Sequence, residues 1–209
     1  MAIDMKAVMD KLQKRIFTTE TDFQLALAME IERMYPEAEV RCEFPPNYES
    51  RVEPQSGRIH LDILVRHEGE TIPIELKYRT KKLDLVGVDN YGFNLMEQGA
   101  HDEGSYGFWR DVCRISEFKG NIKSCHRGYA IFLTNDLWYK NPSYEGCKTN
   151  YKDFDLNKIS ITKRKGCVGA KDKVLQEVPE IQAGWYSLTD ITTEIHTQNS
   201  VFEYYIAEI

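Results

Sequence analysis

Hydrophobic and polar residues alternate on both sides of a short polar break in the stretch RIHLDILVRHEGETIPIELKYRT, which runs from Arg58 to Thr80. Two runs with this period-two alternation on either side of the polar break His67-Glu68-Gly69-Glu70 are typical of antiparallel strands joined by a tight turn. With Glu68 and Gly69 as the turn residues, the pairing is symmetric and places Asp62 directly opposite Glu75. The pattern therefore predicts an antiparallel hairpin in which the two acids are neighbours.

The two faces of this hairpin differ in chemistry, because alternate side chains of a strand share a face. Asp62, Glu75 and Lys77 are expected on one face. The opposite face is expected to be core and holds Leu61, Ile63, Val65, Ile72, Ile74 and Leu76. His60 falls opposite Lys77 on the charged face, where a histidine is more often a neutral hydrogen-bonding neighbour than a catalytic group.

Two carboxylates that face each other across strands oppose folding by a few tenths to about 1 kcal/mol. A divalent cation between them removes that cost, and Mg²⁺ typically takes one or two carboxylates and completes its shell with water and phosphate. Lys77 could orient or deprotonate a water there, or stabilise a developing charge. For an isolated E-x-K tripeptide a solvated sheet face is the better reading, but an aspartate in register on the partner strand favours a phosphodiester-cleaving site.

Asp62, followed after twelve residues by Glu75-Leu76-Lys77, resembles the D-x(n)-E-x-K motif of the PD-(D/E)xK nuclease superfamily. Leu61 stands where the full motif has proline. The resemblance implies a restriction-endonuclease-like α-β-β-β-α-β core and a nuclease that depends on Mg²⁺ or Mn²⁺. It also implies that Asp62 and Glu75 bind the metal while Lys77 positions the water and the scissile phosphate. Many of these nucleases add a glutamate at the start of the first core helix, and Glu20 matches that place, with Glu30 as the alternative.

Helical periodicity predicts two helices before the hairpin. Residues 2–16 read as an amphipathic helix, and Thr19 with Asp22 three residues later resembles a capping box that opens a second helix ending at Pro36. A strand is expected over Ala38 to Phe44.

After the hairpin, the glycine-broken segment 91–107 is expected to be a loop or a short helix, and 108–118 a helix. Its inward residues are expected to be Phe108, Val112 and Ile115, and its outward residues Arg110, Asp111, Arg114 and Glu117. The apolar run 128–136 predicts a buried central strand, and 201–209 a closing strand on the core sheet. The fold class is thus α/β with a mixed α+β sheet, in a single domain over 1–209 with its core at about 18–136.

Two groups of basic residues are candidate nucleic-acid contacts, because Lys and Arg on phosphates dominate such affinity. Arg79, Lys81 and Lys82 lead away from the charged strand. Segment 141–173 reads as a basic surface insertion with a short strand at 159–162, and its candidate contacts are Lys163, Arg164 and Lys165. A solvated loop is the alternative for this insertion, since nine Lys or Arg against four acids over 140–173 also suit exposure to water.

Composition limits the classes of protein that fit. The 209 residues carry a net charge of −6, so nucleic-acid binding has to come from local patches. Five widely spaced cysteines without a C-x-x-C pair predict reduced thiols in a cytoplasmic protein. No apolar run is long enough for a membrane span. DNA is the expected substrate. The sequence leaves open DNA against RNA, duplex against single strand, internal against terminal cleavage, and whether a homodimer makes paired cuts.

Overall fold

The chain is a mixed α+β protein in a computed structural model that describes residues 2–48, 50–52, 60–86, 92–147, 149–190 and 199–209. The helices are α1 (Met5–Lys11), α2 (Glu20–Met34), α3 (His101–Asn121) and the short 3-10 helix η2 (Lys152–Phe154). The strands are β1 (Glu39–Phe44), β2 (Leu61–His67), β3 (Glu70–Arg79), β4 (Leu83–Val86), β5 (Gly92–Leu95), β6 (Tyr129–Thr134), β7 (Arg164–Val168), β8 (Lys171–Leu175), β9 (Gln182–Asp190) and β10 (Val201–Glu208). Within these residues, β4–β5 and β7–β8 form separate hairpins.

The main sheet has six strands in the order β1-β2-β3-β6-β10-β9. β3 and β6 are parallel, and the other neighbours are antiparallel. A parallel pair needs a crossover connection, and α3 supplies it by covering the sheet between β3 and β6. The buried strand expected at 128–136 is confirmed as β6, and the closing strand as β10.

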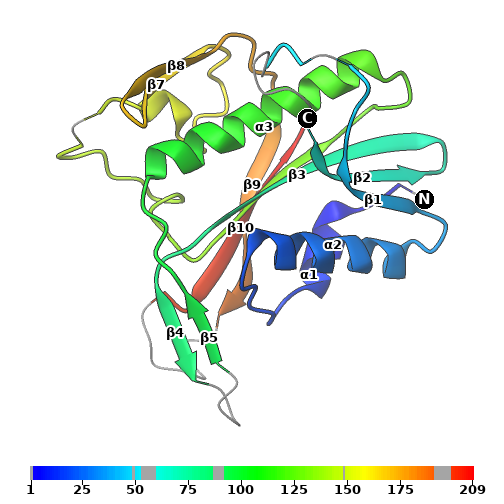
Figure 1. Ribbon diagram of the computed structural model, residues 1–209, viewed down its shortest axis with the longest axis horizontal. Helices are drawn as coiled ribbons and strands as arrows, with labels where there is room; N and C mark the ends of the chain where they lie inside the picture. Colours follow the sequence, from blue (N-terminus) through cyan, green and yellow to red (C-terminus); the bar gives the residue numbers. More distant parts are fainter. Residues whose placement is uncertain (1, 49, 53–59, 87–91, 148, 191–198) are drawn as a thin grey trace.

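The sheet separates two layers of packing (Figure 1). α1 and α2 cover one face, where Ile63, Ile74 and Leu27 belong to one apolar core. α3 and the β7–β8 hairpin cover the other face, where Phe108 and Phe132 belong to a second core. The β4–β5 hairpin projects away from the body of the molecule. Residues that point from β3 toward α3 therefore enter the space between sheet and helix.

The N-terminal helices follow the expected capping chemistry in part. Thr19 Oγ1 accepts a hydrogen bond from Asp22 N at 3.0 Å, so the predicted start of α2 is confirmed. The carboxylate of Asp22 reaches one residue further back and accepts from Thr18 N at 3.0 Å. The predicted helix over 2–16 is too long, because α1 ends at Lys11 and the chain turns through Lys14, whose φ is +67°.

α3 begins at His101, inside the segment expected to be a loop or short helix. Glycines in this segment suggested breaks, but two of them are places of close contact. A Cβ on Gly104 would lie 2.3 Å from the hydroxyl oxygen of Tyr139, and one on Gly107 would lie 3.3 Å from Cε of Lys77. These glycines let α3 pack closely against β3 and Tyr139, and that packing outweighs their low helix propensity.

The expected outward face of α3 is wrong for two residues. Asp111 is only 1% exposed and Arg114 only 8% exposed, whereas Phe108, Val112 and Ile115 are buried as predicted. The helix lies between the sheet and the β7–β8 layer, so little of its circumference faces solvent.

The basic insertion is more ordered than expected. Residues 159–162 form a turn and a bend instead of a strand, and the strands lie at β7 and β8. They are joined at Gly169 and Ala170, whose φ values of +55° and +61° suit a two-residue hairpin turn. Phe154 of η2 anchors this layer, since its carbonyl accepts a hydrogen bond from Nε1 of Trp109 at 3.0 Å.

Candidate active site

The β2–β3 hairpin has the register that the sequence predicted. Ile63 pairs with Ile74 and His67 with Glu70, and the turn residues Glu68 and Gly69 both have positive φ. Two consecutive positive φ angles match the twist of the flanking strands in a two-residue turn. The register carried from the turn thus brings Asp62 beside the second half of β3.

The apolar face departs from the prediction at one position. Leu61 packs with Leu64 and Phe118 instead of joining the core that contains Ile63. Alternation fails at this end of β2, where the pairing with β3 stops at Ile63 and the neighbouring Glu43 of β1 has a positive φ of +52°.

Beyond Ile74, side chains replace a neighbouring strand along the edge of β3. Asp62 Oδ2 accepts a hydrogen bond from Leu76 N at 2.6 Å, and Glu20 Oε2 accepts one from Tyr78 N at 2.7 Å. These are the alternate N–H groups of the strand that point away from β6. Glu20 at the start of α2 and Asp62 at the start of β2 are thereby fixed on the same edge.

The acidic residue that the sequence offered as an alternative lies elsewhere. Glu30 forms an ion pair with Arg33 one turn along α2, with Nε of the arginine 3.0 Å from Oε2 of the carboxylate. His60 is also outside the cluster, since its exposed ring lies 3.8 Å from Glu43.

Glu75 and Lys77 point from β3 toward α3, where they meet two residues of that helix. Lys77 Nζ lies 2.7 Å from Oδ2 of Asp111. Nη2 of Arg114 lies 3.0 Å from Oε1 of Glu75, an ion pair whose angles fall outside hydrogen-bond geometry. The side chains of β3 and α3 therefore form a charged seam, defined here as Glu75, Lys77, Asp111 and Arg114.

The electrostatics of the seam and its neighbours show an excess of negative charge. Burial raises the pKa of Asp62 to about 6, against the opposing effects of Lys77 and the Leu76 N–H group. Burial, followed by the charge of Asp111, raises the pKa of Glu75 well above its ordinary value. Burial alone would lower the pKa of Lys77, but Asp111 and Glu20 outweigh it and raise the pKa.

A count of charges gives the same result. The charged side chains of this cluster, among the residues described, are four carboxylates (Glu20, Asp62, Glu75 and Asp111) and three cations (Lys77, Arg114 and Arg110, whose Nη2 lies 3.9 Å from Oδ1 of Asp111). Buried carboxylates keep their charge only when they are paired or hydrogen-bonded. An added cation would lower the free energy of this arrangement.

The donor groups suit a hard metal ion in chemistry. Oε2 of Glu75 is buried and makes no hydrogen bond with any residue that the structure describes. Within the same part of the chain, no three His, Cys, Asp or Glu side chains converge as metal ligands. Mg²⁺ commonly takes only one or two carboxylates from the protein, so Asp62 and Glu75 fit such an ion in charge and in ligand type.

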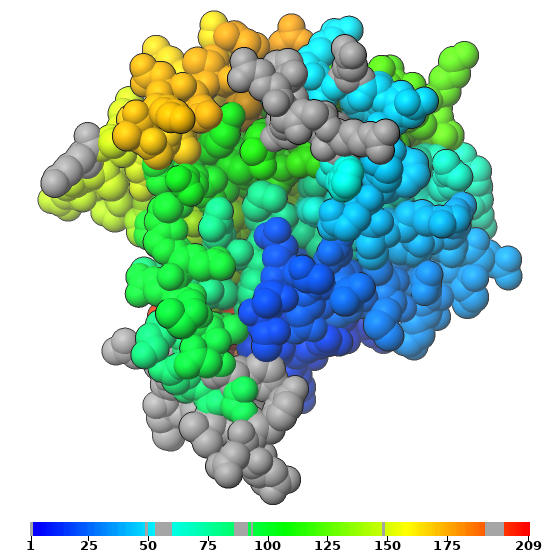
Figure 2. Space-filling view, in the orientation of Figure 1, coloured from blue at the N-terminus to red at the C-terminus, as the bar shows by residue number. Residues whose placement is uncertain are grey.

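A groove of about 520 Å³ opens beside Glu20 and Lys77. Its floor is the end of β3, one wall is the start of α2, and the other wall is the end of β5 with the residues that follow it. In Figure 2 the blue-green floor shows between the blue start of α2 and the green segment that leads into α3. Of the predicted catalytic side chains, Glu20 and Lys77 are therefore reachable from this side of the molecule, whereas Asp62 and Glu75 do not line the groove.

Of the first group of predicted nucleic-acid contacts, one residue lies in this groove. Arg79 lines the groove. Lys81 Nζ is 2.7 Å from Oε1 of Glu97, and Lys82 Nζ is 2.9 Å from Oδ2 of Asp84. Both lysines are thus already paired with acids.

The second group divides between surface and interior. Lys163 and Lys165 are exposed, as expected of phosphate contacts. Arg164 is fully buried, its guanidinium lies 3.2 Å from the ring centre of Trp109, and it donates to the carbonyl oxygen of Lys158 at 2.6 Å. Burial and the carbonyl contacts make Arg164 a structural residue, in contrast to the surface contact expected of it.

Sequence reasoning missed Asp111 and Arg114. Their signal is the spacing of Gly104, Gly107, Asp111 and Arg114, which follows one helical stripe at intervals of three and four residues.

No family model matches the chain, and neither the curated proteins nor the solved structures contain a match. The described helices include none with the length and apolar character of a membrane span.

Proposed function

We propose that the chain is a Mg²⁺- or Mn²⁺-dependent nuclease of the PD-(D/E)xK type, with DNA as its expected substrate. The observation that carries the proposal is the cluster of Asp62 on β2 with Glu75 and Lys77 on β3. Burial raises the pKa of both carboxyl groups, and the lysine lies beside them. Apart from the β4–β5 hairpin inserted between β3 and α3, the order α2-β1-β2-β3-α3-β6, with β3 and β6 parallel, supports the restriction-endonuclease-like core.

The residues of the chain divide the work as follows. Asp62 and Glu75 would hold the ion, and Glu20 lies on the same edge of β3 to complete its surroundings. When bound, such an ion supplies Lewis acidity toward water and neutralises charge at the phosphate. The hydrogen bond from Leu76 N orients the Asp62 carboxylate and leaves its second oxygen for another partner.

Lys77 acts as a cation in this proposal. Because its pKa is raised, it stays protonated at neutral pH, so it can donate hydrogen bonds to a water or a phosphate but does not take a proton. Asp111 limits the motion of the ammonium group through their 2.7 Å contact. Asp111 is therefore a positioning residue for Lys77.

A nucleic-acid-binding module that does not cut is the second candidate. Two observations favour it: no three-acid metal group converges in the described residues, and the Lys77 ammonium is already paired with Asp111. The two candidates differ in turnover.

Turnover is tested with supercoiled plasmid and labelled oligonucleotides in Mg²⁺ or Mn²⁺. Wild type should cut them, and Lys77→Ala should cut orders of magnitude more slowly while binding metal nearly as well, because an interaction made in the transition state affects rate more than ground-state affinity. The matched control is Lys123→Ala, an exposed lysine far from the seam that should cut like wild type. Equal rates for Lys77→Ala and wild type would reject the proposed site, and binding without cutting would favour the second candidate.

A further inference from the structure

The groove beside Glu20 and Lys77 has a floor that carries positive charge and one wall of apolar and amide groups. Lys77 and Arg79 lie on the floor, and Asn94, Met96 and Gln98 lie on the wall formed by the end of β5 and the residues after it. Met96 is 70% exposed, so its side chain is open to a ligand in the groove. The floor and this wall thus offer different chemistry to one ligand.

The side chain of Arg79 is held in place near its Nε atom. Its Nε is buried, and a Cβ on Gly104 would lie 3.3 Å from it, so the closeness of α3 holds the side chain in place. Unlike Lys81 and Lys82, it forms no ion pair with any residue in the described part of the chain. An arginine fork held in this way and lacking a carboxylate partner suits a phosphate, which it can bind through two parallel hydrogen bonds.

The position of Arg79 relates it to the proposed site of cleavage. Arg79 follows Lys77 by two residues on the same face of β3, a separation of about 6.6 Å at the usual rise of a strand. Consecutive phosphates of one nucleic-acid strand have a similar separation. A phosphate on Arg79 would therefore be the neighbour of the phosphate at Lys77.

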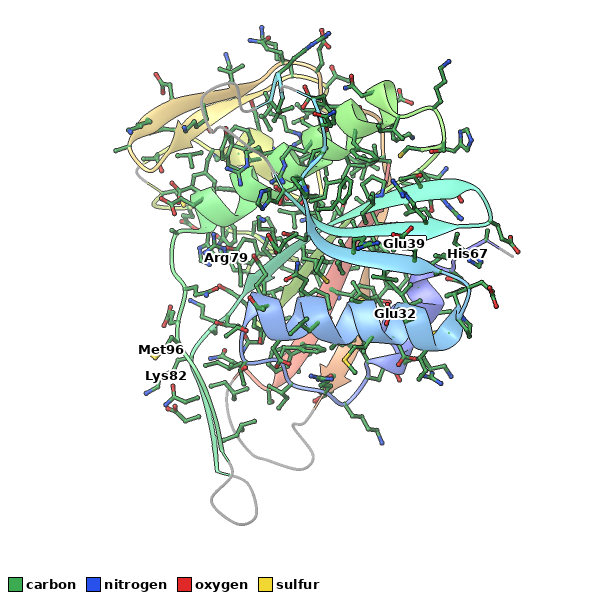
Figure 3. The ribbon with its side chains drawn as sticks, turned by 45° about the vertical axis from the view of Figure 1, so that its right-hand side comes forward. Glu32, Glu39, His67, Arg79, Lys82 and Met96 are labelled. Carbon is green, nitrogen blue, oxygen red and sulfur yellow. The ribbon has the colours of Figure 1, made fainter. Side chains whose placement is uncertain are left out.

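Hydrogen bonds hold the wall that contains Met96 against the floor. Thr80 Oγ1 donates to the carbonyl oxygen of Met96 at 2.7 Å, and Gln98 N donates to the carbonyl oxygen of Thr80 at 2.8 Å. Figure 3 shows Arg79 near the start of α3, with Met96 below it at the base of the β4–β5 hairpin. A methionine thioether packs well on aromatic rings, and the exposed amides of Asn94 and Gln98 can bond to the edges of a base.

We infer that this groove is a subsite for one unpaired nucleotide, with its phosphate on Arg79 and its base against Met96. The volume of about 520 Å³ is in the range of small-molecule sites. A base in a duplex is stacked and paired, so it cannot enter such a groove. This inference rests on the proposed function and specifies its substrate as nucleic acid that is single-stranded beside the cut.

The binding test uses methyl NMR on protein labelled with ¹³C at its six methionines, in EDTA and without metal. The Met96 signal is assigned with Met96→Leu. Deoxyadenosine 5′-monophosphate should shift this signal through the ring current of the base. Inorganic phosphate alone should leave it in place, and deoxyadenosine should bind about tenfold or more weakly because it lacks the charged contact.

The matched variants are Arg79→Gln and Lys123→Gln. The first should weaken nucleotide binding about tenfold or more, and the second should leave it unchanged. The inference is overturned if the nucleotide does not move the Met96 signal, or if Arg79→Gln binds like wild type.

A cleavage arm compares single-stranded and duplex oligonucleotides of one sequence. Single strands should be cut faster, and Met96→Ala should reduce that preference; faster cutting of the duplex would overturn the inference. The proposed function fails separately, if wild type and Lys77→Ala do not differ in cutting. Nucleotide binding in EDTA does not depend on that outcome.

Discussion

Replacing Asp62 by asparagine should stabilise the metal-free protein near neutral pH and have little effect near pH 4. The folded protein raises the pKa of this carboxyl from 3.8 to about 6. Its ionisation is therefore less favourable in the folded than in the unfolded chain. A difference of about two pKa units, at 1.36 kcal/mol for each, amounts to at most about 3 kcal/mol.

The direction with pH follows from proton binding. Between about pH 4 and 6 the folded protein holds more of this proton than the unfolded chain, so stability falls as the pH rises through this window. Above about pH 6 both states are ionised and the loss stays constant. Asparagine is neutral and similar in shape, and its Oδ1 can still accept the hydrogen bond that Leu76 N donates at 2.6 Å.

The assay is urea unfolding followed by tryptophan fluorescence, in EDTA, at several pH values between about 4 and 7.5. The free energy of unfolding of Asp62→Asn should exceed that of wild type by a margin that grows with pH. Asp172→Asn, an exposed change on β8, is the matched control and should change the free energy of unfolding by less than about 0.5 kcal/mol. A destabilising effect of Asp62→Asn near neutral pH would refute the reasoning, as would a constant difference.

Mg²⁺ should reverse the order of stability of wild type and Asp62→Asn near neutral pH. A ligand that binds only the folded state adds about 4.1 kcal/mol at a thousand times its Kd, which exceeds the difference of at most about 3 kcal/mol between wild type and Asp62→Asn. Wild type should gain this amount and Asp62→Asn much less. An equal gain in both would indicate that the metal binds elsewhere.

Three further changes test other parts of the structure. Gly104→Ala should destabilise the protein by about 1–3 kcal/mol in thermal or urea unfolding, despite the better helix propensity of alanine, because the new Cβ meets the Tyr139 hydroxyl; adding Tyr139→Phe should restore part of the loss, and no recovery would contradict this contact. Arg164→Ala should cost about 2–4 kcal/mol in the same assay, since it leaves buried carbonyls without donors and removes the contact with Trp109; a loss below about 0.5 kcal/mol would place the residue at the surface after all. Asp111→Asn should lower kcat more than it raises KM, because it loosens Lys77; a change in KM alone would remove its positioning role.

The basic surface of the insertion gives a companion test. Lys163→Ala with Lys165→Ala should leave the unfolding free energy unchanged and weaken nucleic-acid binding. The salt dependence of binding should fall by roughly one unit for each phosphate that the protein no longer neutralises. Unchanged binding would show that this exposed pair belongs to a solvated loop.

The hairpin could be predicted from the sequence because its information is local. Turn residues set the register, and the alternation of Ile63 and Ile74 with polar neighbours sets the faces. The same holds for the start of α2, where Thr19 and Asp22 lie within one turn of each other. Contacts between residues a few positions apart depend on backbone dihedral preferences, and those preferences follow directly from the residue types.

The seam could not be predicted because it joins residues that are far apart in the chain. Asp111 lies 34 positions after Lys77, and its charge alone suggested a solvent-facing helix surface. Gly104 and Gly107 suggested a break in the helix. The sequence around them does not show that Tyr139 and Lys77, which are distant in the chain, pack closely against them. Arg164 was likewise read as an exposed cation, but it is fully buried against Trp109, a residue that lies 55 positions earlier in the chain.

The backbone amides of Leu76 and Tyr78 can report on Asp62 and Glu20 separately. In most strands an amide is shielded from solvent by a neighbouring strand, but the N–H groups of Leu76 and Tyr78 are shielded by single carboxylates. Their hydrogen-deuterium exchange rates thus depend on the orientation of Asp62 and Glu20, one amide for each side chain. Residue-resolved exchange could follow each carboxylate as it engages a cation or turns away, before any substrate is known.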